Sequence, residues 1–318
     1  MNNFDPNFLA WGGFLLLVLA LLALDLGVFH KGHKEVGTRS ALLSIGLYVL
    51  LAGAFCAAIF CFSGTEAGTQ FATGYIIELT LSIDNIFVIA LIMKHFMVPK
   101  QYHHSVLFWG ILVAIVLRFV FIVAATGLIK EFDWVLYIFG AFLVITGIKM
   151  AAAKDEEPKL EENLIVNLCK KNLRTTENYS GGKFFVRQNL AGKSLLYATP
   201  LFVVLMVVNL IDIVFAFDSI PAIFAITTNP FIVFTSNIFA ILGLRSMYFV
   251  LVNVIERFKY LKYGLAVILV LIGTKMIINH YYMEEIISTS TSLLLTAIII
   301  SASILYSLYK TKKIEQKN

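Results

Sequence analysis

The sequence predicts an all-α, polytopic membrane helix bundle of about nine transmembrane helices, six of which form an inverted repeat of three plus three helices. The first observation is composition: of 318 residues, 59% are hydrophobic and 14% are charged, and the mean hydropathy is +0.85. A water-soluble core of ordinary composition cannot bury that much apolar surface. The second is a series of nine long apolar stretches, and the third is a set of charged positions that occurs twice among them.

The nine stretches follow from the need for about 20 mostly apolar residues to cross the hydrocarbon layer. The first lacks the basic flank and the cleavage site of a signal peptide, so we expect a retained span. The sixth contains Pro200 and Pro221, so we expect an interfacial lead-in and a break near the second proline. The stretches lie near residues 8 to 29, 41 to 62, 71 to 93, 105 to 129, 134 to 153, 195 to 226, 231 to 255, 260 to 279 and 292 to 309.

The distribution of basic residues predicts the orientation. If segment 154–194 is cytoplasmic, 20 of the 25 Lys and Arg residues lie in cytoplasmic segments, four lie within spans and only Lys130 lies outside. Cytoplasmic loops carry an excess of Lys and Arg, so we expect the N-terminus outside and the C-terminus inside. Because these residues are loop residues on one side of a membrane, the net charge of +5 does not support nucleic-acid binding.

Spans three to five and six to eight match at several independent points. Each repeat has three spans, an odd number, so the two copies must enter the membrane from opposite sides. In transporters, inverted repeats of this kind hold the substrate near the bilayer midplane. The matched positions are Glu78, Asp84 and Asn85 with Asp212, Asp218 and Ser219, Arg118 with Arg245, and GIKM at 147–150 with GTKM at 273–276.

The repeat divides the chain into five parts. The segment between the two copies is polar, mixed in charge and contains glycine, as expected of a solvated connector. The parts are two N-terminal transmembrane helices (1–69), the first three-helix repeat (70–153), a cytoplasmic linker (154–194), the second three-helix repeat (195–280), and a last transmembrane helix with a basic cytoplasmic tail (281–318).

Four carboxylates in two spans need a compensating partner, because a charge at mid-bilayer costs about 3 kcal/mol on insertion scales. On a helix, positions seven apart nearly coincide, whereas positions six apart diverge by about 120°. Glu78, Ser82 and Asn85 therefore form one polar stripe, with Asp84 to one side unless the helix unwinds. The counterpart stripe carries Asn209, Asp212 and Ser219, with Asp218 to one side.

The side chains of these stripes offer only oxygen ligands. Carboxylate, amide and hydroxyl oxygens suit Mg²⁺, Ca²⁺ or Mn²⁺ and explain Cu(I) or Zn²⁺ selection poorly. The histidines fall at span ends or in loops, and we expect those between 95 and 104 to form a solvated cytoplasmic turn. Cys56, Cys61 and Cys169 have no metal-binding spacing and are expected to be inert thiols.

An alternative is that the four acids form buried ion pairs that only hold the bundle together. Arg118 and Arg245 can do both, pairing with the acids in an empty site and yielding to an arriving cation. Lys149 and Lys275 lie near span ends, where their side chains can snorkel to the interface. Asp25, near the inner end of span one, is either a gate or accessory ligand or a solvated end residue.

Several longer motifs resemble the TerC family, most closely its Alx branch. They are ELTLSIDN at 78–85, FDWVLYIFGAFLVITGIKM at 132–150, IDIVFAFDSIPAIFA at 211–225 and TSNIFAILGLRSMYF at 235–249.

The resemblance covers nearly the whole chain. It implies a bacterial inner-membrane protein of about nine helices, named for tellurium resistance and associated with Mn²⁺ export and with supplying Mn²⁺ to exported enzymes. Asn209 departs from the family pattern, in which a glutamate commonly stands at this position, so this stripe carries one negative charge less. By that resemblance the metal site comprises Glu78, Asp84, Asn85, Asp212, Asp218 and Ser219.

The sequence therefore predicts a transporter that exports a divalent cation, Mn²⁺ by the resemblance, and that can couple export to proton exchange through its carboxylates. One alternative is an exchanger for another cation such as Ca²⁺. Another is a membrane partner that senses pH or redox state, or that delivers metal to exported proteins at the secretion machinery. An enzyme is not expected, because no nucleophile and base pair or phosphate loop is evident. The expected partners are the cation and the lipid bilayer, and no permanently bound cofactor is expected.

Overall fold

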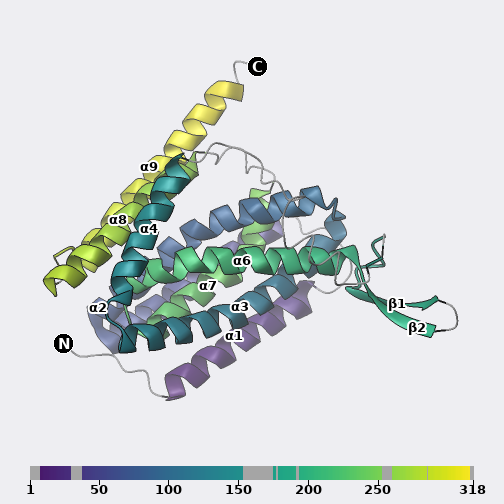
Figure 1. The fold of residues 1–318 in the computed structure, drawn as a ribbon, viewed down its shortest axis with the longest axis horizontal. Coiled ribbons are helices and arrows are strands. Elements are labelled where there is room, and N and C mark those ends of the chain that lie inside the picture. Colours follow the sequence, from purple (N-terminus) through teal and green to yellow (C-terminus); the bar gives the residue numbers. More distant parts are fainter. Residues whose placement is uncertain are drawn as a thin grey trace.

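The structure, a computed structural model, describes residues 8–29, 38–152, 175–176, 178–190, 193–252, 260–284 and 286–315. Within these ranges the chain is almost entirely helical (Figure 1). One antiparallel hairpin interrupts the helices, with Phe185 opposite Ala198 and Leu190 opposite Lys193. The elements are α1 (Phe8–Phe29), α2 (Thr38–His95), α3 (Lys100–Glu131), α4 (Val135–Ala152), β1 (Phe185–Leu190), β2 (Lys193–Ala198), α6 (Pro200–Phe224), α7 (Pro230–Leu251), α8 (Leu261–Tyr282) and α9 (Thr289–Glu315).

Seven of the described helices are long and apolar enough to cross a membrane. The longest, α2, has 58 residues and would extend for roughly 87 Å at 1.5 Å per residue, far more than the ~30 Å hydrocarbon layer. At Gly64 the backbone leaves the helical conformation (φ 90, ψ 173), which divides α2 into two parts that match the second and third predicted stretches. The predicted polytopic helical membrane fold is confirmed, while the count of nine spans stays a prediction.

The sixth stretch has a segment before its helix, as predicted, because residues 195–198 belong to β2 and α6 begins at Pro200. The interfacial position of that segment stays a prediction. The expected break is wrong, because α6 continues through Pro221 to Phe224. Proline suits the first helical position, because its missing N–H would be unpaired there in any case. Pro221 lies in the last turn of α6, so it disturbs only the hydrogen bonding of the turn before it and does not separate two helical segments.

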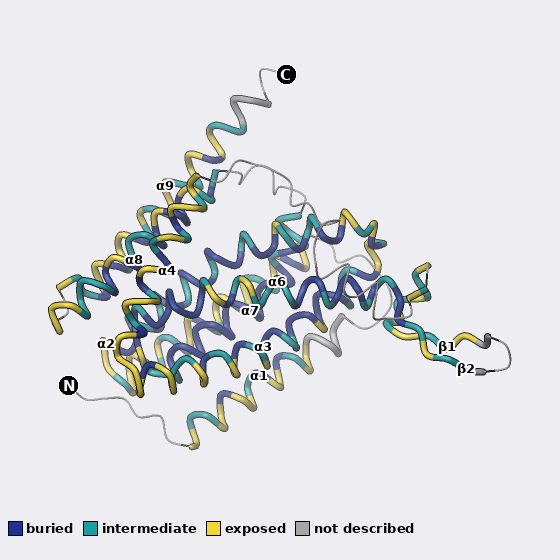
Figure 2. Tube along the Cα trace, in the orientation of Figure 1, coloured by how far each residue is buried: buried dark blue, intermediate teal, exposed yellow. Residues whose placement is uncertain are grey.

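Helix α7 forms the centre of the bundle. In its apolar stretch 94% of the residues are buried, and α2, α3 and α6 all pack against it. Figure 2 shows the buried positions concentrated along α7 and on the faces turned toward it. Helix α1 packs on the start of α7 through the rings of Trp11 and Phe14 against Phe231 and Phe234. Helices α4, α8 and α9 form a second group that runs obliquely to the others (Figure 1).

The loops that are expected to share a side of the membrane lie together. The Tyr179 hydroxyl, in the linker, donates a hydrogen bond of 2.7 Å to the Phe96 carbonyl in the turn after α2. At the other end of α6, one hollow is lined by Leu136 in the first turn of α4, Ala225 just after α6 and Met283 just after α8. This grouping agrees with the predicted topology, and the assignment of one group to the cytoplasm stays a prediction.

Helices α4 and α8 cross closely at small residues. A Cβ added to Gly273 would lie 2.6 Å from the Gly140 carbonyl oxygen, and one added to Gly147 would lie 2.7 Å from that of Ala266. The two contacts occur in opposite order along α4 and α8, so the helices are antiparallel. In the predicted repeat Gly147 corresponds to Gly273, and Gly140 corresponds to Ala266. Exchanging the two repeats therefore converts one contact into the other, as expected of an inverted repeat.

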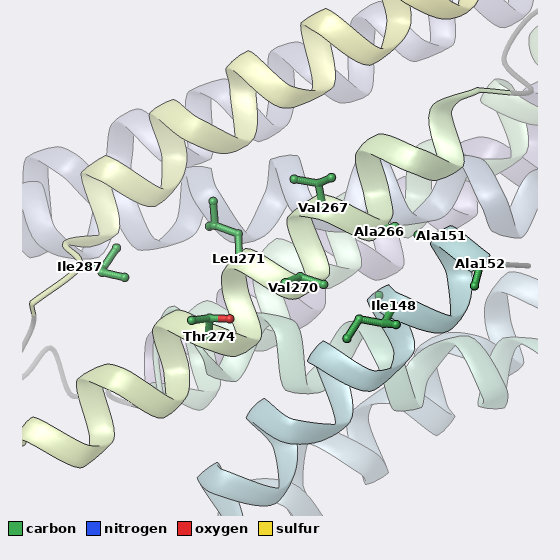
Figure 3. A pocket seen from close by; sticks show the side chains of 10 residues that line it. Ile148, Ala151, Ala152, Ala266, Val267, Val270, Leu271, Thr274 and Ile287 are labelled. Atoms are coloured by element: carbon green, nitrogen blue, oxygen red, sulfur yellow. The ribbon is translucent and has the colours of Figure 1, made fainter.

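Beside this crossing lies a hollow of about 730 Å³ (Figure 3). Its lining side chains are apolar apart from Thr274, and several belong to exposed residues such as Ile148 and Val267. With one hydroxyl and no carboxylate or amide among its lining side chains, the hollow does not offer the several oxygen ligands that a hard cation needs. It is therefore a feature of helix packing, and the polar chemistry lies elsewhere.

The close crossing predicts that Gly273→Ala destabilises the protein. The added methyl would collide with the backbone of α4, and overpacking of this kind typically costs about 1–3 kcal/mol. Gly127→Ala is the control, because nothing lies within 4 Å of a Cβ built there and alanine is the better helix former. Thermal unfolding in detergent should give a lower Tm for the first variant only. An equal Tm for the two variants would contradict the close contact.

Candidate functional site

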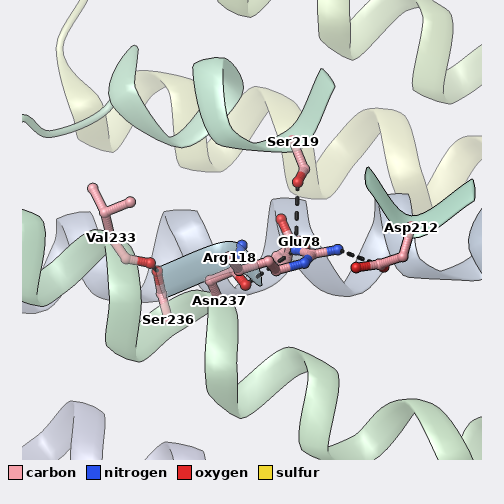
Figure 4. Close-up of polar contacts among 7 residues, drawn as sticks. All are labelled: Glu78, Arg118, Asp212, Ser219, Val233, Ser236 and Asn237. Atoms are coloured by element: carbon pink, nitrogen blue, oxygen red, sulfur yellow. Dashed lines mark hydrogen bonds and ion pairs between the residues drawn. The ribbon is translucent and has the colours of Figure 1, made fainter. Parts of the chain in front are cut away.

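The guanidinium of Arg118 lies at a point where four helices meet (Figure 4). Arg118 is on α3 and 0% exposed. It forms ion pairs with Glu78 of α2 and Asp212 of α6, the latter at 3.3 Å between Nη2 and Oδ1. Its Nη1 also donates hydrogen bonds to Asn237 Oδ1 of α7 at 3.0 Å and to Ser219 Oγ of α6 at 3.4 Å. One cation thus joins both predicted repeats.

Helical periodicity explains which side chains reach this point. Both α2 and α6 stay helical through their acidic motifs, so residues seven apart point the same way. Asp212 and Ser219 consequently both contact Arg118. On α2, Glu78, Ser82 and Asn85 are all buried, as the predicted polar stripe requires.

Five oxygen atoms on the two stripes are buried and have no hydrogen-bond partner among the described residues. Such atoms are rare, since roughly 90% or more of buried polar groups are partnered. Helices α2 and α6 are in contact, and Arg118 pairs with both Glu78 and Asp212, so the two carboxylates lie at one polar centre. Carboxylate, amide and hydroxyl oxygens are also the ligands that hard divalent cations take. The atoms are Glu78 Oε2, Ser82 Oγ, Asn85 Oδ1, Asn209 Oδ1 and Asp212 Oδ2.

The other two predicted acids point away from Arg118. Asp84 lies within electrostatic range of Lys262 at the start of α8, and Asp218 lies beside Thr146 of α4. Neither helix unwinds, so the two acids stay to the side of their stripes. Within the described ranges no three His, Cys, Asp or Glu side chains gather in a metal-holding group. Metal coordination by the six predicted ligands therefore stays a prediction.

The second repeat's arginine has a different neighbour. Arg245 Nη1 donates to His104 Nε2 at 2.8 Å. Next to it, the Tyr248 hydroxyl lies 3.0 Å from His103 Nδ1, and His103 Nε2 lies 2.9 Å from the Val98 carbonyl oxygen. The expectation of a solvated histidine turn is therefore wrong for His103 and His104, which pack between α3 and α7. Their position near a helix start gave the sequence no sign of this contact.

The remaining candidates fall into three cases. Lys149 is exposed, as expected of a lysine that snorkels to the membrane interface. The same expectation is wrong for Lys275, which is only 2% exposed and donates a hydrogen bond of 3.4 Å to Thr289 Oγ1 of α9. Asp25 lies on α1 with its side chain outside the described part, so its role stays a prediction. Sequence reasoning missed Asn237, although the polar run TSN at 235–237 in an apolar span was an available signal.

Comparison with known proteins adds independent findings. A family model described as "Integral membrane protein TerC family" matches residues 63–315. An uncharacterized membrane protein of Myxococcus xanthus, STKORF319, is 48% identical over 303 residues, which cover 95% of this chain and 92% of the relative. Proteins named "Putative membrane-bound redox modulator Alx" are 47% identical in Salmonella typhi and in Escherichia coli K12, covering 86% of this chain and 87% of each relative. No solved structure matches significantly.

The buried ion pairs predict that Arg118→Gln strongly destabilises the protein in the absence of divalent cations. Two carboxylates would lose their counter-charge, and breaking a buried pair from one side typically costs about 3–5 kcal/mol. The control is Arg39→Gln, which removes an exposed arginine from the start of α2. Unfolding in detergent with a chelator measures the effect. Wild-type stability in the Arg118 variant would show that the two acids do not depend on this arginine.

Proposed function

The chain belongs to the TerC family of integral membrane proteins, and on that premise we propose that it exports a divalent cation, foremost Mn²⁺, through the polar region around Arg118. The observation that carries the proposal is the set of five buried, unpartnered oxygens on the facing stripes of α2 and α6. Two of these oxygens belong to carboxylates that are already held near each other by Arg118. A hard cation would satisfy them, since it needs oxygen ligands and tolerates water in the remaining positions.

Arg118 acts in this proposal as a resident counter-charge. While no metal is bound, it neutralises part of the charge of Glu78 and Asp212 and so lowers the cost of two acids within the membrane. A divalent cation competes with the guanidinium for the same carboxylates, because two adjacent positive charges repel each other. Arrival of the cation therefore displaces Arg118, and return of Arg118 promotes release of the cation.

The acids outside the centre extend the path in both directions. Asp84 is six residues beyond Glu78 on α2, and Asp218 is six residues beyond Asp212 on α6, which places each about 9 Å further along its helix. In the predicted topology α2 runs inward here and α6 runs outward. Asp84 then receives the ion on the cytoplasmic side, and Asp218 passes it toward the outside. Protonation of a carboxylate would weaken its hold on the cation and couple export to proton entry.

The choice of Mn²⁺ rests on two supports. The oxygen-only side chains favour Mg²⁺, Ca²⁺ and Mn²⁺ as a class, and the family resemblance selects Mn²⁺ within it. Asn209 contributes a neutral amide oxygen where the family commonly has a carboxylate, so the site carries one negative charge less. The location that fits this role is a bacterial plasma membrane, with the N-terminus outside and the C-terminus inside.

A second candidate function comes from the relatives named as redox modulators. In that role the protein would sense redox state or pH, or pass metal to exported proteins at the secretion machinery, without moving much ion itself. Liposomes that contain only this protein separate the two functions. A transporter fills them with Mn²⁺, whereas a sensor or delivery partner moves no ion in the absence of its partners.

The transport proposal predicts that Glu78→Gln and Asp212→Asn each slow Mn²⁺ transport by at least about tenfold, in line with the usual effect of losing a group that supports a metal site. The measurement is Mn²⁺ uptake into inside-out vesicles or liposomes. Glu66→Gln serves as the control, because Glu66 is an exposed acid on the same helix. Competition by Ca²⁺ and Mg²⁺ in the same assay identifies the preferred cation. If both folded variants transport at the wild-type rate, the central site is not the transport site.

A further inference from the structure

A second hollow, of about 280 Å³, lies where the ends of three helices meet. It is formed by the end of α6, the first turn of α4, the last two turns of α8 and the connection from α8 to α9. Unlike the hollow between α4 and α8, this one contains side chains that bind metals. Its lining includes Met276, Asn279, His280, Met283 and Glu284.

The residues around this hollow are held in place by contacts within the described part. The Asn279 amide accepts a hydrogen bond from the Ile287 N–H and donates one to the Ile287 carbonyl, both at 3.0 Å, and so ties the loop after α8 to the helix. The Tyr137 ring of α4 meets the His280 imidazole edge-on, with centroids 4.6 Å apart. Met283 adopts the left-handed conformation (φ 54) that ends α8 and redirects the chain toward Glu284.

The electrostatics of the hollow favour a cation. Helix α6 ends at Phe224 and α8 ends at Tyr282, so two helix C-termini, each with a partial negative charge, lie at this region. The N-terminus of α4, whose first turn also lines the hollow, brings a partial positive charge that offsets one of them. Glu284 adds a full negative charge. An imidazole nitrogen beside a carboxylate oxygen suits a divalent transition metal, Mn²⁺ included, better than Mg²⁺ or Ca²⁺.

We propose that this hollow binds one divalent transition-metal ion through His280 and Glu284, with water in the remaining coordination positions. In the predicted topology it lies at the outer surface. Phe224 is six residues beyond Asp218, about one further 9 Å step along α6. The hollow is thus placed to receive an ion that leaves the central site, and this exit role rests on the proposed export function. Binding of the metal itself does not depend on that function.

The test is titration of the full chain in lipid nanodiscs with Mn²⁺, using the electron paramagnetic resonance signal of free Mn²⁺ to count bound ions. The central site is first removed by combining Glu78→Gln with Asp212→Asn. This protein is expected to keep one Mn²⁺ site. Adding His280→Ala and Glu284→Gln should weaken that site at least about tenfold. The control adds His95→Ala and Glu66→Gln instead, which change an exposed histidine and an exposed acid elsewhere on α2. This control should leave the affinity of the outer Mn²⁺ site unchanged.

A purely structural role for His280, as a side chain that stabilises the end of α8, predicts a different result. In that case His280→Ala lowers the Tm and leaves Mn²⁺ binding intact, which overturns the proposal. Absence of any Mn²⁺ site in the folded Glu78 and Asp212 double variant overturns it as well. If the outer hollow binds Mn²⁺ but the protein does not transport Mn²⁺ through the central site, the export function is refuted and the outer metal site stands.

Discussion

The ion pairs of Arg118 with Glu78 and Asp212 are the interaction on which the arrangement of the inner helices depends. A buried charge in a membrane must have a partner, because neither lipid nor an apolar neighbour can replace its hydration. Arg118 on α3 meets this requirement with acids on α2 and α6 and with Asn237 on α7. The bonds of a single guanidinium therefore fix the positions of these four helices relative to one another. A cation that replaced the guanidinium would change the contacts of all four helices.

The rest of the fold separates this polar centre from lipid. The enclosed helix α7 supplies Asn237 from a position that no lipid reaches, and the α4–α8 crossing joins the two predicted repeats by backbone contact at Gly140 and Gly273. At this crossing Ile277 and Val270 of α8 lie directly against Gly140 and Gly147 of α4, and small residues of this kind are frequent where membrane helices approach closely. The close α4–α8 crossing and the polar centre around Arg118 thus lie in different groups of helices.

Much of the candidate site follows from local rules. The period of a helix determines that Glu78, Ser82 and Asn85 share a face, and α2 and α6 keep that period through their acids. The errors come from contacts with distant parts of the chain. His103 and His104 look like loop residues until Tyr248 and Arg245 of α7 are placed beside them. Lys275 looks like a snorkelling end residue until α9 covers it, and Pro221 looks like a break until its place in the last turn of α6 is known.

The sequence by itself determined that this protein spans a membrane with many helices, belongs with TerC relatives and carries two acidic stripes. Composition and helical period are local properties, and the cost of charge in lipid applies to any fold. Only the tertiary structure decided which acid meets which arginine, because Glu78 and Arg118 are 40 residues apart and Arg118 and Asp212 are 94 apart. Pairing over such distances depends on how whole helices pack. The same packing brings His280 and Glu284 to one hollow with the end of α6.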